Sequence, residues 1–138
     1  LHPDKTIERQ LVTTVSQLRA ALPKTRIYVM GNLPQWSPSL PDVLLRHDEL
    51  ALDGNSLLRN YSLVRLAAYD ARLRAAAAAN GGQFISAADR LCDGEHCRIA
   101  VELNGTREIS AWDYGHLTFT AATWLALELL ASDLALRR

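Results

Sequence analysis

The sequence lacks the features that mark membrane-spanning, disordered and nucleic-acid-binding chains. No apolar run reaches the roughly 20 residues that a helix needs to cross a bilayer, and no low-complexity tract is present. The 15 Lys and Arg residues balance 15 Asp and Glu residues, and the two signs are interspersed. Electrostatics therefore give no reason to expect nucleic acid or a charged membrane surface as a partner. A Gly-rich strand-to-helix loop is also missing, which argues against a nucleotide site.

The length and the first residues bound the domain organisation. A chain of 138 residues, half of them hydrophobic, fits one domain with a real core. It opens on Leu1-His2-Pro3 rather than on Met, and no signal peptide is recognisable. We therefore expect residues 1–138 to be a single domain, or part of one, from a longer protein.

Cysteine is scarce, and its two copies lie close together. Cys92 and Cys97 flank an Asp-Gly turn. They could form a small disulfide, which would imply an oxidising compartment. They could instead bind a metal together with His96, although a structural zinc needs a fourth ligand that nothing nearby supplies. Two free thiols are the third interpretation, and the close spacing favours the disulfide.

The first third of the chain predicts a helix, a strand and a loop. Apolar residues recur every three or four positions over residues 6–22, which indicates an amphipathic helix ending before Pro23. Residues 26–31 form a short apolar run typical of a buried strand. Three prolines within residues 32–41 predict an ordered loop. A helix tightly linked to a buried strand is typical of a parallel α/β sheet.

The middle of the chain is clear only from residue 61. Residues 42–60 allow one helical turn near 43–45 and a loop or short strand at 49–56. Residues 61–79 predict a helix whose apolar face is interrupted by Asp70.

The last third predicts a strand, a hairpin and a final helix. Residues 83–86 indicate a second short strand. Asn104-Gly105 predicts a hairpin turn between strands at 99–103 and 106–109. Thr118 or Thr120 can cap a final helix running to about Leu136. The chain as a whole is therefore predicted to be α/β with an added hairpin.

Asp113 and His116 lie three residues apart between the hairpin and the final helix. A histidine acts as a general base only when its tautomer and orientation are fixed, commonly by a carboxylate on the other ring nitrogen. A local Asp-x-x-His turn can supply both partners. Trp112, beside them, could shape a pocket or merely cover the loop.

The proline-rich loop holds two further candidate pocket residues, Asn32 and Trp36. The loop leaves the carboxyl end of a predicted parallel strand, which is the edge where ligands bind in open α/β sheets. Trp36 could line such a pocket or pack against the core, as isolated aromatic residues usually do.

Three segments, in this order, resemble the C-terminal part of an SGNH (GDSL-like) hydrolase domain, in particular the extracytoplasmic SGNH domains fused to membrane acyltransferase-3 proteins. Residues 27–34, Ile-Tyr-Val-Met-Gly-Asn-Leu-Pro, resemble the family's strand-then-proline segment, with Asn32 replacing its first proline. Asp89-Arg90-Leu91-Cys92 with Cys97 resembles its paired-cysteine segment. Asp113-Tyr114-Gly115-His116-Leu117-Thr118 resembles its last catalytic block, Asp-x-x-His-Leu-Ser/Thr.

The resemblance implies a three-layer α/β/α fold with a flavodoxin-like parallel sheet, of which this chain is the C-terminal portion. It also implies serine-dependent acyl-ester chemistry, with His116 as general base and Asp113 as its orienting partner, and no metal or organic cofactor. The expected reaction is O-acetyl transfer to cell-surface polysaccharide, or ester hydrolysis from it. The partners would be an acyl donor and a glycan acceptor. The expected location is periplasmic or otherwise extracytoplasmic, on a parent chain attached to an acyltransferase-3 membrane domain.

The sequence departs from the family pattern in its missing nucleophile. No Gly-Asp-Ser and no Gly-x-Asn-Asp occurs in the chain, so we expect the serine and the oxyanion donors to lie upstream. Ser56, in Asp53-Gly54-Asn55-Ser56, could act as the nucleophile only in a circularly rearranged domain, and a surface turn is the ordinary interpretation of that segment. The alternative function is a catalytically incomplete SGNH-like module that binds glycan or a membrane partner.

Overall fold

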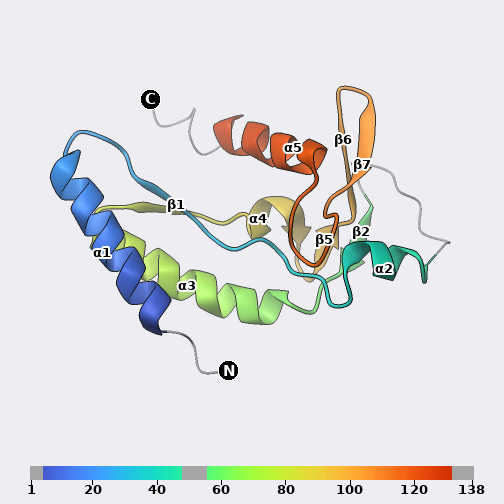
Figure 1. Ribbon diagram of the computed structural model, residues 1–138, viewed down its shortest axis with the longest axis horizontal. Coiled ribbons are helices and arrows are strands. Elements are labelled where there is room, and N and C mark those ends of the chain that lie inside the picture. The colour runs from blue at the N-terminus through green and yellow to red at the C-terminus, as the bar shows by residue number, and fades with distance from the viewer. Residues whose placement is uncertain (1–4, 48–55, 132–138) are drawn as a thin grey trace. The chain divides into compact units, whose positions relative to one another are not determined.

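The computed structural model describes residues 5–47 and 56–131, which fall into two compact units. The first unit is formed by Leu1–Asn32 with Val64–Ser86. The second is formed by Leu33–Leu63 with Ala87–Arg138. Figure 1 shows the elements of both units in chain order.

The first unit consists of two long helices and a parallel pair of strands. Strands β1 and β3 pair in parallel, with Val29 opposite Phe84. This pairing and the alternation of helix and strand confirm the predicted α/β class. The elements are α1 (Lys5–Ala21), β1 (Tyr28–Met30), α3 (Leu63–Ala79) and β3 (Gln83–Ile85).

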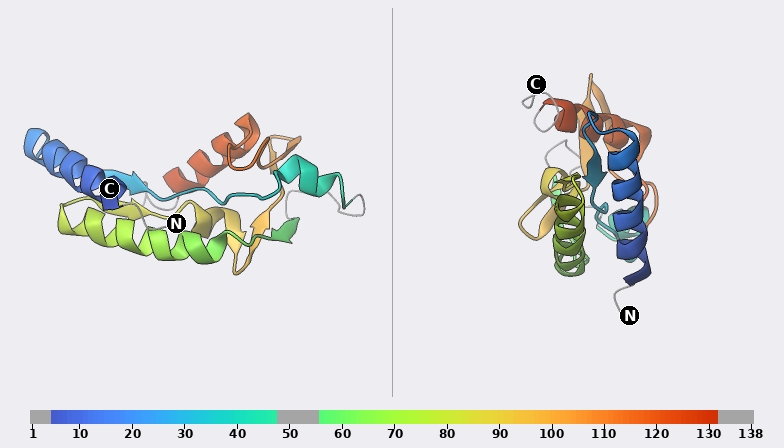
Figure 2. Two further views of the ribbon diagram at one scale, coloured as in Figure 1. Left: turned by 60° about the horizontal axis from the view of Figure 1, so that its bottom comes forward. Right: turned by 90° about the vertical axis from the view of Figure 1, so that its left-hand side faces the viewer.

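Helices α1 and α3 lie side by side (Figures 1 and 2). An ion pair joins Glu8 to Arg72, and the Ser16 hydroxyl donates a hydrogen bond of 2.9 Å to Asn80 Oδ1. The apolar face predicted for α3 is buried at Leu66 and Leu73, whereas in α1 Val15 is buried and Ile7 and Leu18 of the predicted stripe are exposed. The buried hydrophobic residues of this unit are Val15, Ile27, Leu66, Leu73 and Ala77.

Asp70, which interrupts the apolar face of α3, is buried beside the carboxyl ends of both parallel strands. It accepts hydrogen bonds from the Asn32 N–H at 3.3 Å and from the Ser86 hydroxyl at 3.4 Å. A Cβ on Gly31 would lie 2.6 Å from Asp70 Oδ2 and 2.7 Å from the Phe84 ring. Glycine at position 31 therefore allows the carboxylate to approach the backbone this closely.

The described part of the second unit contains two small antiparallel sheets and three helices. Strand β5 (His96–Arg98) pairs with both β2 (Leu57–Arg59) and β4 (Cys92–Asp93), and β6 (Ala100–Leu103) pairs with β7 (Thr106–Ile109). The β6–β7 hairpin turns at Asn104 and Gly105, whose φ angles of 51° and 76° are those that a tight hairpin turn requires. The hairpin prediction is therefore confirmed. The helices are α2 (Leu40–Leu44), α4 (Ala88–Leu91) and α5 (Phe119–Leu129).

Helix α5 contacts both strands of the β6–β7 hairpin (Figure 1). A disulfide joins Cys92 to Cys97 across β4 and β5, which selects the first of the three interpretations of the cysteine pair. One buried cluster consists of Trp36, Leu40, Cys97, Ile99 and Ala111, and a second of Ala87, Leu91 and Leu125.

Most differences between the predicted and the observed secondary structure lie in segments that the sequence did not assign. The proline-rich segment is not a loop throughout, because α2 begins at Leu40 with a proline in its first turn and with Ser39 as its N-cap. Strands β2, β4 and β5 and the short helix α4 were not predicted. The possible strand at 49–56 lies outside the described residues except for Ser56. His2 and the predicted end of the last helix at Leu136 also lie outside them.

Within residues 5–47 and 56–131, no helix combines the length and the apolar character that a membrane span requires.

Candidate active site

A short closed loop joins the hairpin to α5 and carries the Asp-x-x-His segment. Ala111 and Leu117 form an antiparallel bridge across its base. The Trp112 N–H donates to the His116 carbonyl at 3.0 Å, and the Thr118 N–H donates to the Ser110 carbonyl at 3.2 Å. The loop is therefore closed by its own backbone, and residues 112–116 are displayed at its tip.

Two side chains fix the start of α5 directly after this loop. Thr118 is the N-cap residue, and its hydroxyl accepts from the Ala121 N–H at 3.3 Å while donating to the Ile109 carbonyl at 2.7 Å. Glu108, on β7, accepts from the Thr120 N–H at 3.2 Å. Hydrogen bonding from Thr120 lowers the pKa of Glu108, as expected for a carboxylate at a helix N-terminus. Thr118 was predicted from the sequence as a candidate cap, whereas the role of Glu108 was not predicted.

Asp113 and His116 are in direct contact within the loop. The His116 Nδ1 and Asp113 Oδ2 atoms are 2.6 Å apart. The other carboxylate oxygen, Oδ1, accepts from the Gly115 and His116 backbone N–H groups, both at 2.8 Å. Both oxygens of Asp113 are thus engaged by the turn that carries its partner.

These hydrogen bonds set the protonation state of the pair. The Gly115 N–H, followed by the backbone and side chain of His116, lowers the pKa of Asp113 from 3.8 to about 2, against an opposing effect of desolvation. At neutral pH the carboxylate is therefore ionised and can only accept hydrogen bonds. The proton in the Nδ1–Oδ2 hydrogen bond then belongs to Nδ1, which leaves the lone pair of a neutral imidazole on Nε2. This is the tautomer that a general base requires.

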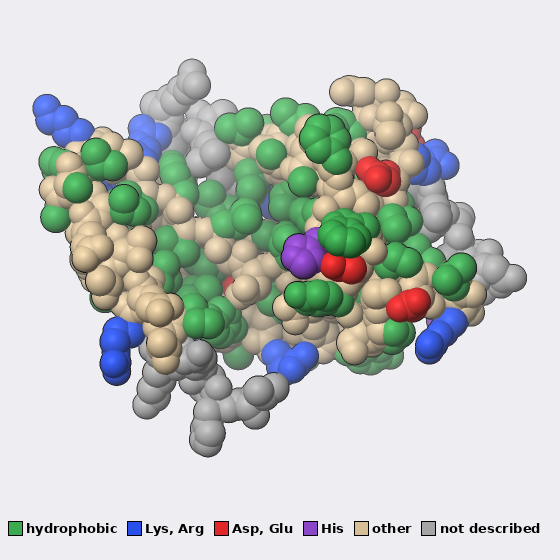
Figure 3. Space-filling model, viewed as in Figure 1, with side chains coloured by type: hydrophobic (Ala, Val, Ile, Leu, Met, Phe, Trp, Pro, Cys, Tyr) green, Lys and Arg blue, Asp and Glu red, His purple; other side chains and the backbone are tan. Residues whose placement is uncertain are grey.

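Two aromatic rings flank the imidazole. The Trp112 ring stacks on it with 5.7 Å between centroids and 28° between planes, and the Tyr114 ring meets it edge-on at 5.5 Å and 74°. Figure 3 shows a histidine side chain on this face of the molecule, with hydrophobic side chains on both sides and an acidic group next to it. The His116 side chain is 62% exposed, so a substrate can reach it.

The proline-rich segment supports the loop through its backbone. The Trp36 N–H donates to the Tyr114 carbonyl at 2.6 Å, and the Leu40 N–H donates to the Asp113 carbonyl at 3.3 Å. Trp36 is only 6% exposed and packs in the core, and it lines a small pocket together with Arg98 and Leu117. Its role as a substrate-pocket residue stays a prediction.

The remaining candidate residues are not part of this loop. Asn32 belongs to the first unit, where its side chain is exposed and its N–H donates to Asp70, and its pocket role also stays a prediction. Ser56 directly precedes β2, and its carbonyl accepts from the Ile99 N–H. That is the edge of an antiparallel sheet, not the strand-to-helix turn on which a nucleophilic serine is typically displayed.

No group of three or more His, Cys, Asp and Glu side chains is placed to hold a metal ion among the residues that the structure describes. Sequence reasoning missed Tyr114 as a ring partner of His116, although its position inside the Asp-x-x-His turn was a signal.

Comparison with known proteins agrees with this fold. The family model described as "SGNH domain (fused to AT3 domains)" matches residues 2–131. No curated protein matches the chain. Among solved structures, the periplasmic domain of a lipopolysaccharide acetyltransferase from Salmonella ser. Paratyphi A matches with a TM-score of 0.70 and 24% identity, over 97% of this chain and 51% of that one.

The chain thus has the fold of about half of that periplasmic domain. The family match extends over nearly the whole chain and includes all three segments on which the resemblance was based. This chain therefore belongs to the family of SGNH domains that are fused to AT3 domains.

Proposed function

We propose that this chain is the C-terminal portion of a single SGNH domain that performs acyl-ester chemistry on cell-surface polysaccharide. The observation that carries the proposal is the 2.6 Å contact between His116 Nδ1 and Asp113 Oδ2, formed by the Asp-x-x-His block of an SGNH family member. The nucleophilic serine and the oxyanion donors would be encoded upstream, because the chain covers only half of its structural neighbour.

In the proposed mechanism His116 moves the protons and Asp113 holds His116. Nε2 removes the hydroxyl proton of the serine as the serine oxygen attacks the acyl carbonyl, and it returns that proton to the leaving group. Asp113 keeps Nδ1 protonated and stabilises the imidazolium that forms in between. In the second half-reaction Nε2 removes the proton of the acceptor hydroxyl as its oxygen attacks the acyl-serine carbonyl, and it returns that proton to the serine oxygen as the bond between that oxygen and the acyl carbon breaks. A sugar hydroxyl as acceptor gives O-acyl transfer, and water gives hydrolysis.

Two observations support an extracytoplasmic location on a membrane-attached parent. The Cys92–Cys97 disulfide is typical of an oxidising compartment such as the periplasm. The family is defined by fusion to AT3 domains, and the neighbouring structure is a periplasmic domain of a lipopolysaccharide acetyltransferase. We propose that an AT3 membrane domain supplies the acyl donor and that the SGNH domain receives the acyl group.

The proposal is tested by labelling with a serine-reactive fluorophosphonate. The chain is compared with a version extended upstream by about 80 residues, roughly what a complete domain would add. We expect the extended protein alone to be labelled, and we expect His116→Ala to reduce its labelling by at least about 10²-fold. Labelling of the short chain at Ser56 would refute the assignment of the nucleophile to an upstream segment. An extended protein that folds but is not labelled would favour the glycan-binding module without catalysis.

Transfer and hydrolysis are separated with the same extended protein. Released acetate is measured beside acetyl groups attached to a polysaccharide acceptor. Acetylated acceptor that requires His116 indicates a transferase, and free acetate alone indicates an esterase.

A further inference from the structure

The strongest unassigned feature of the loop is the pair of aromatic rings around His116. Trp112 and Tyr114 are 61% and 55% exposed, and neither belongs to a buried cluster of the second unit. Single exposed aromatic residues are common on protein surfaces. Here both rings contact the same imidazole, from two different directions.

The backbone on both sides holds these rings in place. The Trp112 N–H is bound to the His116 carbonyl across the loop, and the Tyr114 carbonyl is bound by the Trp36 N–H. Because these backbone positions are fixed, each ring is presented to the imidazole by a rigid support. The contacts are therefore part of the folded loop.

The hydrogen bond to Asp113 does not fully fix the imidazole by itself. The His116 side chain is 62% exposed, and exposed ion pairs hold their partners weakly because water competes for the same atoms. The imidazole can also turn about its side-chain torsions, the outer of which is broad. A ring stacked on its face restricts that rotation and keeps water from that face.

We propose that Trp112 is a positioning residue for His116, and that Tyr114 limits the movement of the imidazole from a second side. The indole face holds the imidazole in the orientation in which Nδ1 meets Asp113, so that Nε2 is directed to the reacting hydroxyl. A cation within about 6 Å of an indole ring is attracted by its face, and the stacked centroids are 5.7 Å apart. Trp112 therefore interacts more strongly with the imidazolium than with the neutral ring.

This second effect rests on the proposed function, since the imidazolium forms when the hydroxyl O–H bond breaks and an N–H bond forms at Nε2. The positioning effect does not, because it can be measured in the resting protein. The two effects are therefore tested separately.

The positioning effect is tested by NMR on this chain, through the ring protons and ring nitrogens of His116. Trp112→Leu removes the aromatic face and keeps an apolar side chain, whereas Trp112→Phe keeps a face. We expect the ring-current displacement of the His116 ring protons to fall by more than half in Trp112→Leu, with the Nε2–H tautomer becoming detectable. Trp112→Phe should retain most of the displacement and the Nδ1–H tautomer.

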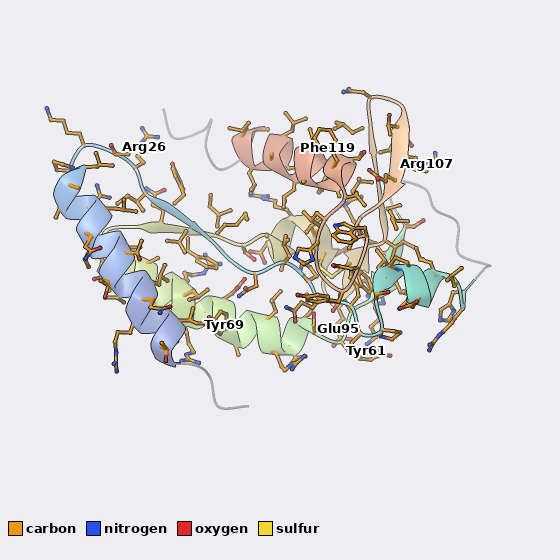
Figure 4. The ribbon with its side chains drawn as sticks, viewed as in Figure 1. Arg26, Tyr61, Tyr69, Glu95, Arg107 and Phe119 are labelled. Atoms are coloured by element: carbon orange, nitrogen blue, oxygen red, sulfur yellow. A yellow bond between two sulfur atoms is a disulfide. The ribbon has the colours of Figure 1, made fainter. Side chains whose placement is uncertain are left out.

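The matched control is Phe119→Leu. Phe119 lies at the start of α5, three residues after His116, and is 86% exposed (Figure 4). Its ring makes no stacking contact with His116 among the ring contacts of the described residues. Phe119→Leu should leave the ring-current displacement of the His116 ring protons and the Nδ1–H tautomer unchanged. Unchanged His116 signals in Trp112→Leu would overturn the positioning proposal, whatever the catalytic activity.

The second effect is measured in the extended, active protein. Trp112→Leu should lower kcat about fivefold to tenfold with little change in KM, and Trp112→Phe should recover most of the loss. A loss confined to KM would overturn the imidazolium effect and make Trp112 a substrate contact. Failure of the proposed function itself is distinguishable, because it abolishes fluorophosphonate labelling of the unmutated extended protein.

Discussion

Replacing Asp113 by Asn tests the chemistry of the Asp-His pair without dismantling the loop. Asp113 Oδ1 accepts from the Gly115 and His116 backbone N–H groups, both at 2.8 Å, and the amide oxygen of Asn can do the same. The turn should therefore keep its shape. At the second position, an NH₂ group replaces the oxygen that lies 2.6 Å from His116 Nδ1.

The expected loss of kcat follows from the hydrogen-bond donors and acceptors at that position. An NH₂ group can only donate, so a hydrogen bond to it requires Nδ1 to lose its proton and Nε2 to carry it. Nε2 then cannot accept the proton of the nucleophile. In the serine-histidine-aspartate template this tautomer change costs about 10⁴-fold in kcat, and we expect a loss of 10³-fold to 10⁴-fold here.

The assay combines turnover of the extended protein with NMR of the chain. The ring-nitrogen signals of His116 should change from the Nδ1–H to the Nε2–H tautomer in Asp113→Asn, while the backbone amide spectrum stays native. Asp93→Asn is the matched control, since Asp93 is an exposed residue of β4. Turnover of Asp113→Asn within about tenfold of the unmutated protein, with the tautomer inverted, would refute the role of the pair.

Three further predictions concern the stability of the loop and of the second unit. The pKa of Asp113 is lowered from 3.8 to about 2, so the ionised carboxylate should stabilise the loop fully above about pH 4 and lose this effect as the pH falls through about 2. Hydrogen exchange of the Gly115 and His116 amides should become faster as the pH falls over this range. Amide protection that does not change with pH would contradict the hydrogen bonds assigned to Asp113. Leu40→Ala should lower the free energy of unfolding in urea by about 2–5 kcal/mol because Leu40 is fully buried. The exposed Leu45→Ala should change it by less than about 0.5 kcal/mol, and equal effects would contradict the placement of the core. Removing the disulfide with Cys92→Ala and Cys97→Ala should cost about 2 kcal/mol, as a loop with a sequence separation of 5 implies, and reduction of the unmutated protein should have a similar effect.

The sequence was most informative where structure depends on neighbours along the chain. Helices α1 and α3 follow from the spacing of apolar residues, and the β6–β7 hairpin follows from Asn104-Gly105. The contact between Asp113 and His116 is of the same kind, because three residues of one turn hold both partners. Local spacing also favoured the disulfide between Cys92 and Cys97.

The sequence was least informative where short segments pair with distant ones. Strands β2 and β5 have three residues each, which is too short for a recognisable hydrophobic period. They pair with each other although about 40 positions separate them in the chain. Likewise, Glu108 caps α5 from β7, and the Trp36 N–H binds the Tyr114 carbonyl. Such contacts leave no pattern in either segment alone.

By itself, the sequence determined the α/β class, the long helices, the hairpin and the identity of the Asp113–His116 pair, because each depends on periodicity or on spacing within one turn. Only the tertiary structure decided that Trp36 is buried while its backbone supports the loop, and that the Trp112 and Tyr114 rings contact the imidazole. The physical reason is that burial and ring orientation depend on which distant backbone groups meet. That is settled by packing of the whole unit rather than by any residue's neighbours in the chain.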